Sequence, residues 1–589
     1  MQLTSGGFGP SAMTPKEGAP RYAGIWRDTV RAAGEAAVAR VRDAWRTSSL
    51  YQVTLSGPMP DRILMTPEDL RPRSLEDADA MFRGRYRLPG GTVSAKNASI
   101  FDAPTPNETW AEELHSFEWV RHFAGVGGEP AAAHVRHAVA DWIERFGRGN
   151  ALAWRPHVTA RRLIAWCAHQ KLVFSGVDIL WRSAVLHTMA RQARHLQRTA
   201  AEAPDGEPRL IAAIGLALLG VILPDGAQRL RKGLELTAAE LRRQILPDGG
   251  HISRNPEALL RILVDLMTLA SALKMQGRAV PEQLQVAIDR MAPMLRFFRH
   301  GDGRLALFNG GGEAAEKTID AALARHDAQG RPFAYASHSK YQRVNAGRSI
   351  LLMDVGGPPP PAFSTAAHAA PLSFEWSVGA NRLVVNCGTT LLRGLEWREA
   401  CRQSIAHSTL TLDGESPTAL AAGLPATLLG ARLVQDGAVE SAREGDDSGT
   451  WIRAVNYGFV KAYGLEHERR IFIDSSGEDL RGEDVLHALP DAKRLVKRKQ
   501  PFTLRFHIHP DVRISLAQDG ASVILVPPTG EGWRFRAAGG PVTLEESVYL
   551  GAGDTVRRTE QIVVAGDFMG ETLKVQWALK QMPQGETPR

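Results

Sequence analysis

The sequence predicts an α+β protein, in which a helical N-terminal part precedes an antiparallel β-domain. Apolar residues recur every three or four positions from about residue 26 to residue 298, the period of helices that bury one face. After Pro332 the period becomes two, with short β-branched runs between turn signals, which is typical of strands. The 589 residues are 44% hydrophobic and 23% charged, a globular composition too long for one simple core.

The helical part is expected over residues 26–325. Residues 1–25 are rich in Gly, Pro and Ser, so we expect a flexible arm there. Helices are expected at 27–45, 112–123, 131–146, 158–172, 185–198, 210–223, 227–245, 257–273 and 281–298. Clusters such as GVGGEP and LPDGG separate them. About nine consecutive helices with short links predict a helical barrel or array.

The β-domain is expected over residues 330–589, with the boundary near 325–335. Strands are expected at 349–355, 382–386, 409–412, 451–457, 469–473, 502–509, 522–526 and 561–564. Because these runs are short and separated by turns, we expect one antiparallel sheet packed on another.

Composition excludes several classes of protein. The 71 Lys and Arg against 64 Asp and Glu leave a mild charge of +7, and no dense basic block with aromatics predicts a nucleic-acid partner. The three cysteines form no CxxC pair, which argues against a disulfide framework or a thiolate zinc site. The longest apolar stretch, 210–223, is short of the roughly 20 residues of a membrane span, so we expect a buried helix and no transmembrane segment.

Several separated segments resemble the heparinase II/III-like family of polysaccharide lyases. QRVNAGRSILLMDVGG is similar to the family's R-x-x-G-R-x-x-x-x-x-D-x-G, and AAHAAPLSFE, VVNCGT and HSTLTLDG follow in the family's order. In the helical part, QILPDGGHISRNPEALL resembles Q-x-x-x-D-G-x-H-x-E-x-S-P-x-Y-H. The resemblance covers residues 80–580 and implies an (α/α) toroid followed by a β-sandwich, with a substrate cleft between them.

The resemblance implies β-elimination on an anionic, uronate-containing polysaccharide. Such a lyase removes a proton beside a carboxylate, stabilises the enolate and protonates the leaving oxygen. The family's Tyr and the first His of its H-x-H motif fall on Ala258 and Ala366. The alternatives are therefore a non-catalytic carbohydrate-binding protein on the same scaffold and a protein-interaction scaffold that uses the helical barrel.

Four residues carry the acid–base prediction. The resemblance makes His251, His368 and His407 the retained family histidines. Tyr341 is a spare phenol just before the first strong strand. Each also has a structural alternative, because histidines can hold loops by hydrogen bonds and strand tyrosines are commonly core residues.

A divalent metal, Zn²⁺ or Ca²⁺, is the one cofactor that the resemblance suggests. His368, Asn386 and His407 match positions that hold a metal in some members of the family. Two imidazoles and an amide oxygen are a weaker donor set than two imidazoles and a carboxylate. The alternative is that these side chains tie loops together at the edge of the sandwich.

Substrate binding is expected of Arg254, Trp397, Arg398 and Arg402. A guanidinium can hold a carboxylate through two parallel hydrogen bonds, and an indole face suits stacking on a sugar. The alternatives are loop tying, packing and salt bridging.

Two further basic rows are expected to be solvated strand faces. Arg505, His507 and His509 alternate with apolar residues, and successive side chains of a strand point to opposite sides. His467, Arg469 and Arg470 are expected to lie at a similar solvated strand end.

The resemblance implies a place in the cell envelope or periplasm. The N-terminus shows no apolar signal-peptide core, so the cytoplasm is the alternative location.

Overall fold

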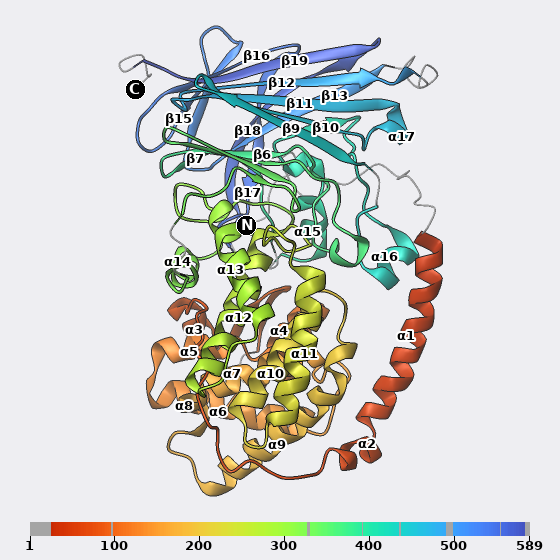
Figure 1. Cartoon of the computed structure of the whole chain (residues 1–589), viewed down its shortest axis with the longest axis vertical. Helices are drawn as coiled ribbons and strands as arrows, with labels where there is room; N and C mark the ends of the chain where they lie inside the picture. Colours follow the sequence, from red (N-terminus) through yellow and green to blue (C-terminus); the bar gives the residue numbers. More distant parts are fainter. Residues whose placement is uncertain are drawn as a thin grey trace.

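The computed structural model describes residues 25–583, apart from 96–97, 327–329, 391–392, 435–436, 491–498 and 554. Nearly all of the arm expected over residues 1–25 lies outside this range. Figure 1 shows an elongated molecule with helices at one end and β-sheets at the other. The α+β class is confirmed, as is the toroid followed by a sandwich.

The helical domain contains fourteen helices among the described residues. They are α1 (Ile25–Thr47), α2 (Ser49–Thr54), α3 (Leu75–Phe82), α4 (Glu108–Ser116), α5 (Val120–Val126), α6 (Gly128–Phe146), α7 (Pro156–Ala168), α8 (Gln170–Phe174), α9 (Ile179–Thr199), α10 (Glu207–Ile222), α11 (Ala227–Gln244), α12 (Pro256–Met275), α13 (Glu282–Phe297) and α14 (Glu316–Ala324). A hairpin of β1 (Arg85–Leu88) and β2 (Gly91–Ser94) lies between α3 and α4. Two expected helices are each split in two: 112–123 becomes α4 and α5, and 158–172 becomes α7 and α8.

The apolar stretch after residue 210 forms α10, whose residues from Ala212 to Ile222 are all buried. It packs closely on α11 because glycines remove side chains at the contact. A Cβ on Gly220 would lie 2.3 Å from the nitrogen of Leu230, and one on Gly233 would lie 2.3 Å from the nitrogen of Ala217. Within the described residues, no helix combines the length and apolarity needed to cross a membrane.

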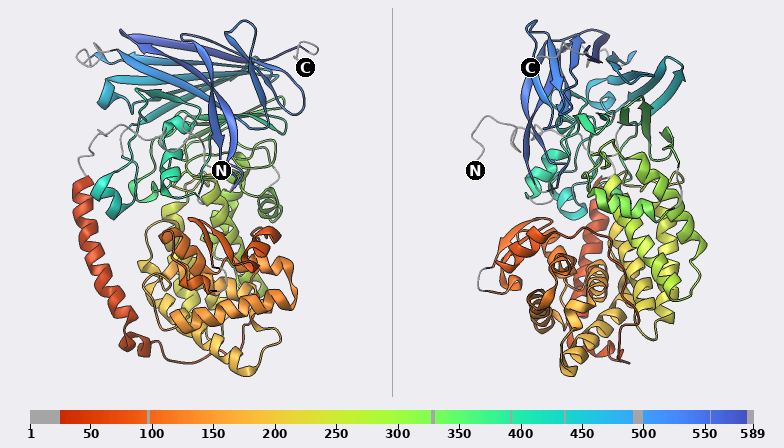
Figure 2. Two further views of the ribbon diagram at one scale, coloured as in Figure 1. Left: turned by 180° about the vertical axis from the view of Figure 1, so that it is seen from behind. Right: turned by 90° about the vertical axis from the view of Figure 1, so that its left-hand side faces the viewer.

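The helix α1 runs along the outside of the molecule (Figures 1 and 2). It contacts α2 and, in the other domain, α16 (Gly423–Leu429). Four apolar side chains along it are exposed, namely Val30, Val38, Val41 and Trp45. The helical spacing predicted this helix, but its apolar stripe is not part of the core.

The β-domain is a sandwich of two large antiparallel sheets. The first sheet has the order β17-β18-β13-β7-β6-β5-β4-β3, with β8 paired to β13. Its strands are β3 (Tyr335–Ala336), β4 (Tyr341–Ala346), β5 (Ser349–Asp354), β6 (Phe374–Val378), β7 (Asn381–Val385), β8 (Leu410–Leu412), β13 (Gln500–Ile508), β17 (Val542–Tyr549) and β18 (Arg557–Phe568). In Figure 1 this sheet lies on the side of the sandwich that meets the helical domain.

The second sheet has the order β14-β15-β16-β19-β12-β11-β10-β9. Its strands are β9 (Val439–Asp446), β10 (Gly449–Asn456), β11 (Leu465–Asp474), β12 (Asp479–Ala488), β14 (Arg513–Leu516), β15 (Ser522–Val526), β16 (Trp533–Ala538) and β19 (Thr572–Gln581). Trp376, Trp533, Phe374 and Trp577 fill the core between the two sheets. Two other short helices, α15 (Leu395–Cys401) and α17 (Val460–Tyr463), lie in connections.

The prediction of solvated basic strand faces is wrong for the first row and for two of the three residues of the second. Arg505 and His509 are at most 9% exposed, and His507 is fully buried. The reason is a cover of neighbouring segments: His507 Nδ1 lies 2.8 Å from Ser547 Oγ of β17, and its Nε2 lies 3.0 Å from the carbonyl oxygen of Ile405.

Two residues of the second row are buried for a different reason, whereas Arg470 is exposed as expected. His467 and Arg469 point into the sandwich, where both contact the Asp484 carboxylate at 2.7 Å. The charge of Arg469 is balanced by Asp484 inside the core, and burial lowers the pKa of His467.

Candidate interdomain site

His251 follows the turn at the end of α11, where Ile245 and His251 form an isolated β-bridge. Its Nε2 lies 3.0 Å from Gln244 Oε1, and its Nδ1 lies 2.7 Å from Ser253 Oγ. Because Gln244 Nε2 donates elsewhere, Gln244 Oε1 accepts, and His251 is the Nε2–H tautomer. Burial, opposed by Glu207, lowers the pKa of His251 to about 4. Both ring nitrogens are therefore occupied and the ring is neutral.

Arg254 joins the helical domain to the sandwich. Its Nε donates to the carbonyl of Ser339 at 2.9 Å, its Nη1 to that of Gly357 at 2.8 Å, and its Nη2 to that of Lys340 at 3.1 Å. Nη2 also pairs with the carboxylate of Asp354. Arg254 has a backbone φ of 62°, which costs a residue with a side chain about 1–3 kcal/mol. The guanidinium contacts hold that strained backbone in place.

Tyr341 is fully buried on β4 beside this arginine. Its hydroxyl donates to the carbonyl of Arg254 at 2.7 Å and accepts from Asn309 Nδ2 at 2.7 Å. Burial and the nearby Asp354 carboxylate raise the pKa of Tyr341 well above its usual value. The phenol therefore stays protonated and serves as a link between the two domains.

His368 and His407 lie next to each other, as the family resemblance implied. Nδ1 of His368 lies 2.8 Å from Nε2 of His407, and Nδ1 of His407 lies 2.8 Å from the carbonyl oxygen of Gln403. Because a carbonyl only accepts, His407 carries its proton on Nδ1 and His368 donates to it. Nε2 of His368 is then a buried lone pair with no hydrogen-bond partner. Burial lowers the pKa of both rings, that of His407 to about 4.

The residues present do not fit a metal shared by His368, Asn386 and His407. The His407 lone pair is already taken by His368. Asn386 is fully buried, and its Oδ1 accepts the backbone N–H of Ser408 at 3.1 Å. Nor do the described residues contain a group of three or more His, Cys, Asp or Glu placed to hold a metal.

The residues expected to bind substrate are divided in space and in role. Arg402 is buried and donates to the carbonyls of Ala367 and Ser364, both at 2.8 Å, so it holds the loop that carries His368. Burial and Arg398 lower the pKa of Arg402 to about 9. Trp397 and Arg398 lie on α15, and Trp397 packs on a small core around Cys401.

Contacts connect four of the nine predicted site residues into one interdomain seam. Asn309 Nδ2 donates to Tyr341 and, at 3.2 Å, to Asp354, while Asn309 Oδ1 accepts from the backbone N–H of His368 at 3.2 Å. The seam thus runs from Arg254 through Asp354 and Asn309 to the His368–His407 pair. We define the interdomain seam as these five residues together with Tyr341. It is built to hold two domains together more than to expose reactive groups.

Sequence reasoning missed Asn309 and Asp354. Asp354 is the Asp of the first family-like segment, so a signal was present, although the segment gave it no role. Asn309 lies in the turn-rich NGGG stretch, where its φ of 50° suits an asparagine.

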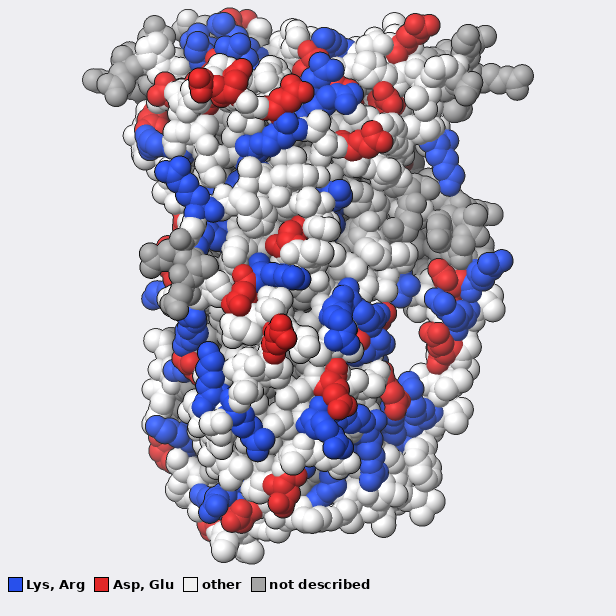
Figure 3. Space-filling view, in the orientation of Figure 1, with Lys and Arg blue, Asp and Glu red and all other residues white. Residues whose placement is uncertain are grey.

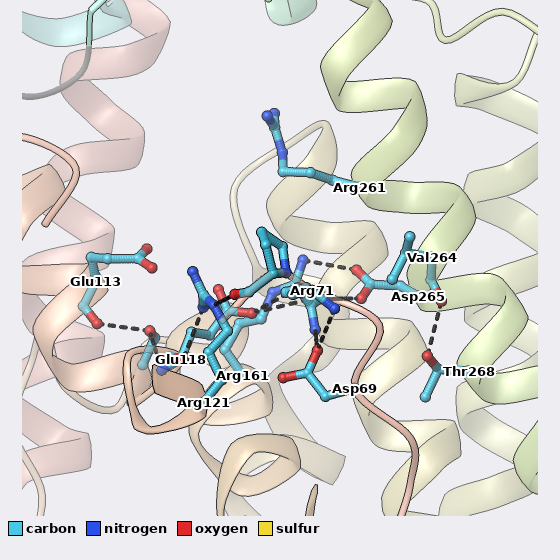
Figure 4. A network of polar contacts seen from close by, with 12 residues as sticks. Asp69, Arg71, Glu113, Glu118, Arg121, Arg161, Arg261, Val264, Asp265 and Thr268 are labelled. Atoms are coloured by element: carbon cyan, nitrogen blue, oxygen red, sulfur yellow. Dashed lines mark hydrogen bonds and ion pairs between the residues drawn. The ribbon is translucent and has the colours of Figure 1, made fainter. Parts of the chain in front are cut away.

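A second buried charge network lies within the helical domain (Figure 4). Arg71 contacts Glu118 at 3.3 Å and also pairs with Asp265 of α12, and Arg161 of α7 contacts the same Asp265 at 2.8 Å. Glu113 lies beside it, and burial together with the neighbouring Glu118 raises the pKa of Glu113 to about 7. A signal existed here too, because Asp265 interrupts the largely apolar stretch of α12 over residues 262–273.

The chain is similar to proteins of known name along most of its length. A model of the heparinase II/III-like C-terminal domain matches residues 328–578. FtsZ-localized protein C of Caulobacter vibrioides (strain NA1000 / CB15N) is 34% identical over 549 residues, which are 92% of this chain and 94% of that protein.

Solved structures share the architecture. Heparinase III superposes with a TM-score of 0.69 at 14% identity, over 95% of this chain and 92% of that one. A mutant of the heparan sulfate lyase HepC from Pedobacter heparinus gives 0.60 at 14% identity, over 97% and 92%. These structural likenesses show the fold alone. With the family model and the full-length relative, they place the chain in the heparinase II/III-like family, as a divergent member.

Proposed function

We propose that this protein is a non-catalytic member of its family that localises with FtsZ and acts by binding a protein partner. The observation that carries the proposal is the state of the interdomain seam. The positions of the family's Tyr and first His are Ala258 and Ala366. His251, Tyr341 and His407 of the expected catalytic set and Arg254 of the expected substrate-binding set are buried and bonded to the protein itself. His368 is buried as well, and its Nδ1 is bonded to His407.

A lyase needs a base with a lone pair that reaches the substrate and a cation that meets its carboxylate. Both nitrogens of His251 and both nitrogens of His407 already have partners. The guanidinium of Arg254 already donates to three backbone carbonyls and pairs with the carboxylate of Asp354. Removing any of these groups from its partners would leave a buried polar atom unsatisfied, at a cost of about 1–3 kcal/mol.

The relative supplies the direction for the proposed role. A sequence identity of 34% over nearly the whole of both chains supports a shared function more strongly than a structural likeness to a lyase at 14% identity. We therefore favour the compartment in which FtsZ is found over the cell envelope.

Two measurements test the proposal. A fluorescent fusion in the native host should co-localise with FtsZ and disperse when FtsZ is depleted. The purified chain should release no unsaturated uronate, followed by ultraviolet absorbance, from a panel of acidic polysaccharides that heparinase III or other lyases cleave in parallel. A diffuse fusion, or absorbance that grows with enzyme concentration, would overturn it.

A second candidate is a lyase that acts on an anionic, uronate-containing polysaccharide in the cell envelope. One observation favours it: Nε2 of His368 is an unpartnered lone pair, with the positive charges of Arg398 and Arg402 close enough to lower the pKa of His368. This candidate requires ultraviolet-absorbing product that disappears in His368→Ala while the variant keeps its thermal midpoint.

A further inference from the structure

The outer face of the eight-stranded sheet contains a groove. Figure 1 shows that this sheet lies at the end of the molecule far from the helical domain. The groove has a volume of about 720 Å³. Side chains from β9, β10, β11, β12, β19 and β16 line it. With neighbouring strands about 4.8 Å apart, six strands span about 24 Å, the length of roughly seven extended residues. Figure 3 shows basic and acidic side chains interspersed over this end of the molecule.

The strand register arranges the lining in two parallel rows, which we call the arginine row and the tryptophan row. The arginine row contains, in strand order, Ala442, Arg453, Arg470, Glu483, Gln576 and Ala538. The tryptophan row contains Glu444, Trp451, Phe472, Arg481, Ala578 and Arg536. Neighbours along a strand that point to the same face are two residues apart, about 6.8 Å, so the groove runs between the rows.

The arginine row contains a like-charge pair. Arg453 and Arg470 are directly opposite each other on β10 and β11, a placement that weakens a sheet. Both pair with one carboxylate, that of Glu468, and their side chains remain 51% and 47% exposed. Two guanidinium groups therefore share one negative charge and keep free donor edges. A position that works against sheet stability indicates a binding role.

The tryptophan row offers an apolar surface next to that pair. Trp451 is 45% exposed, and its ring centre lies 4.9 Å from that of Phe472. Ala442, Ala538 and Ala578 are the small members of the two rows, and they keep the floor low beside these larger side chains.

We propose that this groove binds an acidic peptide segment of a partner protein in extended conformation, an inference that rests on the proposed protein-binding function. Successive side chains of an extended peptide point to opposite sides. Acidic side chains on one side then meet Arg453 and Arg470 through charge-assisted hydrogen bonds. Apolar side chains on the other side lie on Trp451.

The lining favours a peptide over a polyanionic glycan. Glu444 and Glu483 also face the groove, and each would repel a polymer that carries a negative charge on every unit. An alternating peptide can place its carboxylates at the arginine pair and neutral side chains elsewhere. A single aromatic surface also suits one apolar side chain better than a row of sugar rings.

The test uses the full-length chain and the fluorescein-labelled peptide GELELELG, followed by fluorescence anisotropy. The charge-reversed peptide GKLKLKLG and a heparin hexasaccharide competitor identify the ligand class. We expect R453A/R470A to weaken binding of GELELELG at least tenfold and W451A to weaken it severalfold. The matched control R83A/R348A removes two arginines that are also exposed, 74% and 59%, and that each pair with one carboxylate; it should bind like the wild type.

Three results would overturn the proposal that the groove binds an acidic peptide. The first is no binding of GELELELG by the wild type. The second is binding by R453A/R470A that equals that of the wild type, and the third is displacement of the peptide by the hexasaccharide at a lower concentration than unlabelled peptide requires. Unchanged thermal midpoints show that the variants are folded. If the wild-type fusion does not co-localise with FtsZ, the proposed function is wrong whatever the anisotropy shows. If co-localisation is normal but the peptide does not bind, only the proposed peptide site is wrong.

Discussion

The guanidinium of Arg254 lies 4.7 Å from the centre of the Tyr341 ring, while the Tyr341 hydroxyl donates to the Arg254 carbonyl at 2.7 Å. One residue pair thus joins the end of the α11–α12 turn to the first long strand of the sandwich, by its side chain and by its backbone. A positive charge over an aromatic face adds to the attraction.

Replacing Arg254 should destabilise the whole protein. In Arg254→Met the buried carboxylate of Asp354 loses its cation, and breaking a buried pair in this way costs about 3–5 kcal/mol. Guanidinium chloride unfolding measures the loss. Asp354→Asn in the same background should restore part of it, since the uncompensated charge is gone. A loss below about 1 kcal/mol would contradict the role of the interdomain seam.

Acid should weaken the fold through its buried neutral histidines. The folded pKa of His251 is about 4, below the ordinary value near 6.5, so the unfolded chain binds the extra proton between these values. The stability that His251 contributes is complete above pH 6.5 and falls by up to about 1.4 kcal/mol per unit as the pH drops towards 4.

The comparison of wild type with His251→Gln isolates this effect. The variant loses hydrogen bonds at every pH but has no proton to bind, so the stability advantage of the wild type should shrink between pH 6.5 and pH 4. Denaturant unfolding at pH 7.5, 6 and 5 measures it. An advantage that stays constant with pH would show that His251 does not titrate as described.

Glu113 should act in the opposite sense. Its folded pKa is raised to about 7 from 4.5, so its contribution is favourable below pH 4.5 and is lost as the pH rises towards 7. Glu113→Gln should therefore raise the thermal midpoint at pH 8 and leave it nearly unchanged at pH 4.5. Glu129→Gln is the control, because Glu129 is exposed and paired with Arg136. A pH-independent shift would contradict the prediction.

Gly482 should tolerate no side chain. A methyl group there meets the Trp577 ring, whose Nε1 donates to Asp484 at 2.9 Å. Gly482→Ala should cost about 1–3 kcal/mol through overpacking and shift the tryptophan fluorescence. Gly34→Ala is the matched control, since nothing lies within 4 Å of a Cβ there and a helix gains about 0.5–1 kcal/mol from the change. Equal stabilities of the two variants would refute the argument.

The sequence predicted the architecture well because periodicity reports directly on burial. The change from helical spacing to alternation places the boundary between α14, which ends at Ala324, and β3, which begins at Tyr335. The motif resemblance also brought His368 and His407 together across 39 residues.

Periodicity could not predict which polar residues are buried. Alternation puts Arg505 and His507 on one face of β13, but whether solvent or another segment covers that face depends on β17 and the loop before β8, which are distant in sequence. The same holds for Arg254: a guanidinium that binds substrate and one that binds loop carbonyls look identical in a single sequence. What separates them is the set of acceptors that folding delivers.

The interdomain seam also sets the mechanics of the molecule. If the two domains moved apart, Arg254 and Asp354 would become unpaired charges. Bending between the domains is therefore costly, and the molecule behaves as one rigid body. A ligand bound to the distal sheet would then stay at a constant distance from a ligand bound to the helical domain, and the protein would serve as a rigid spacer between the two.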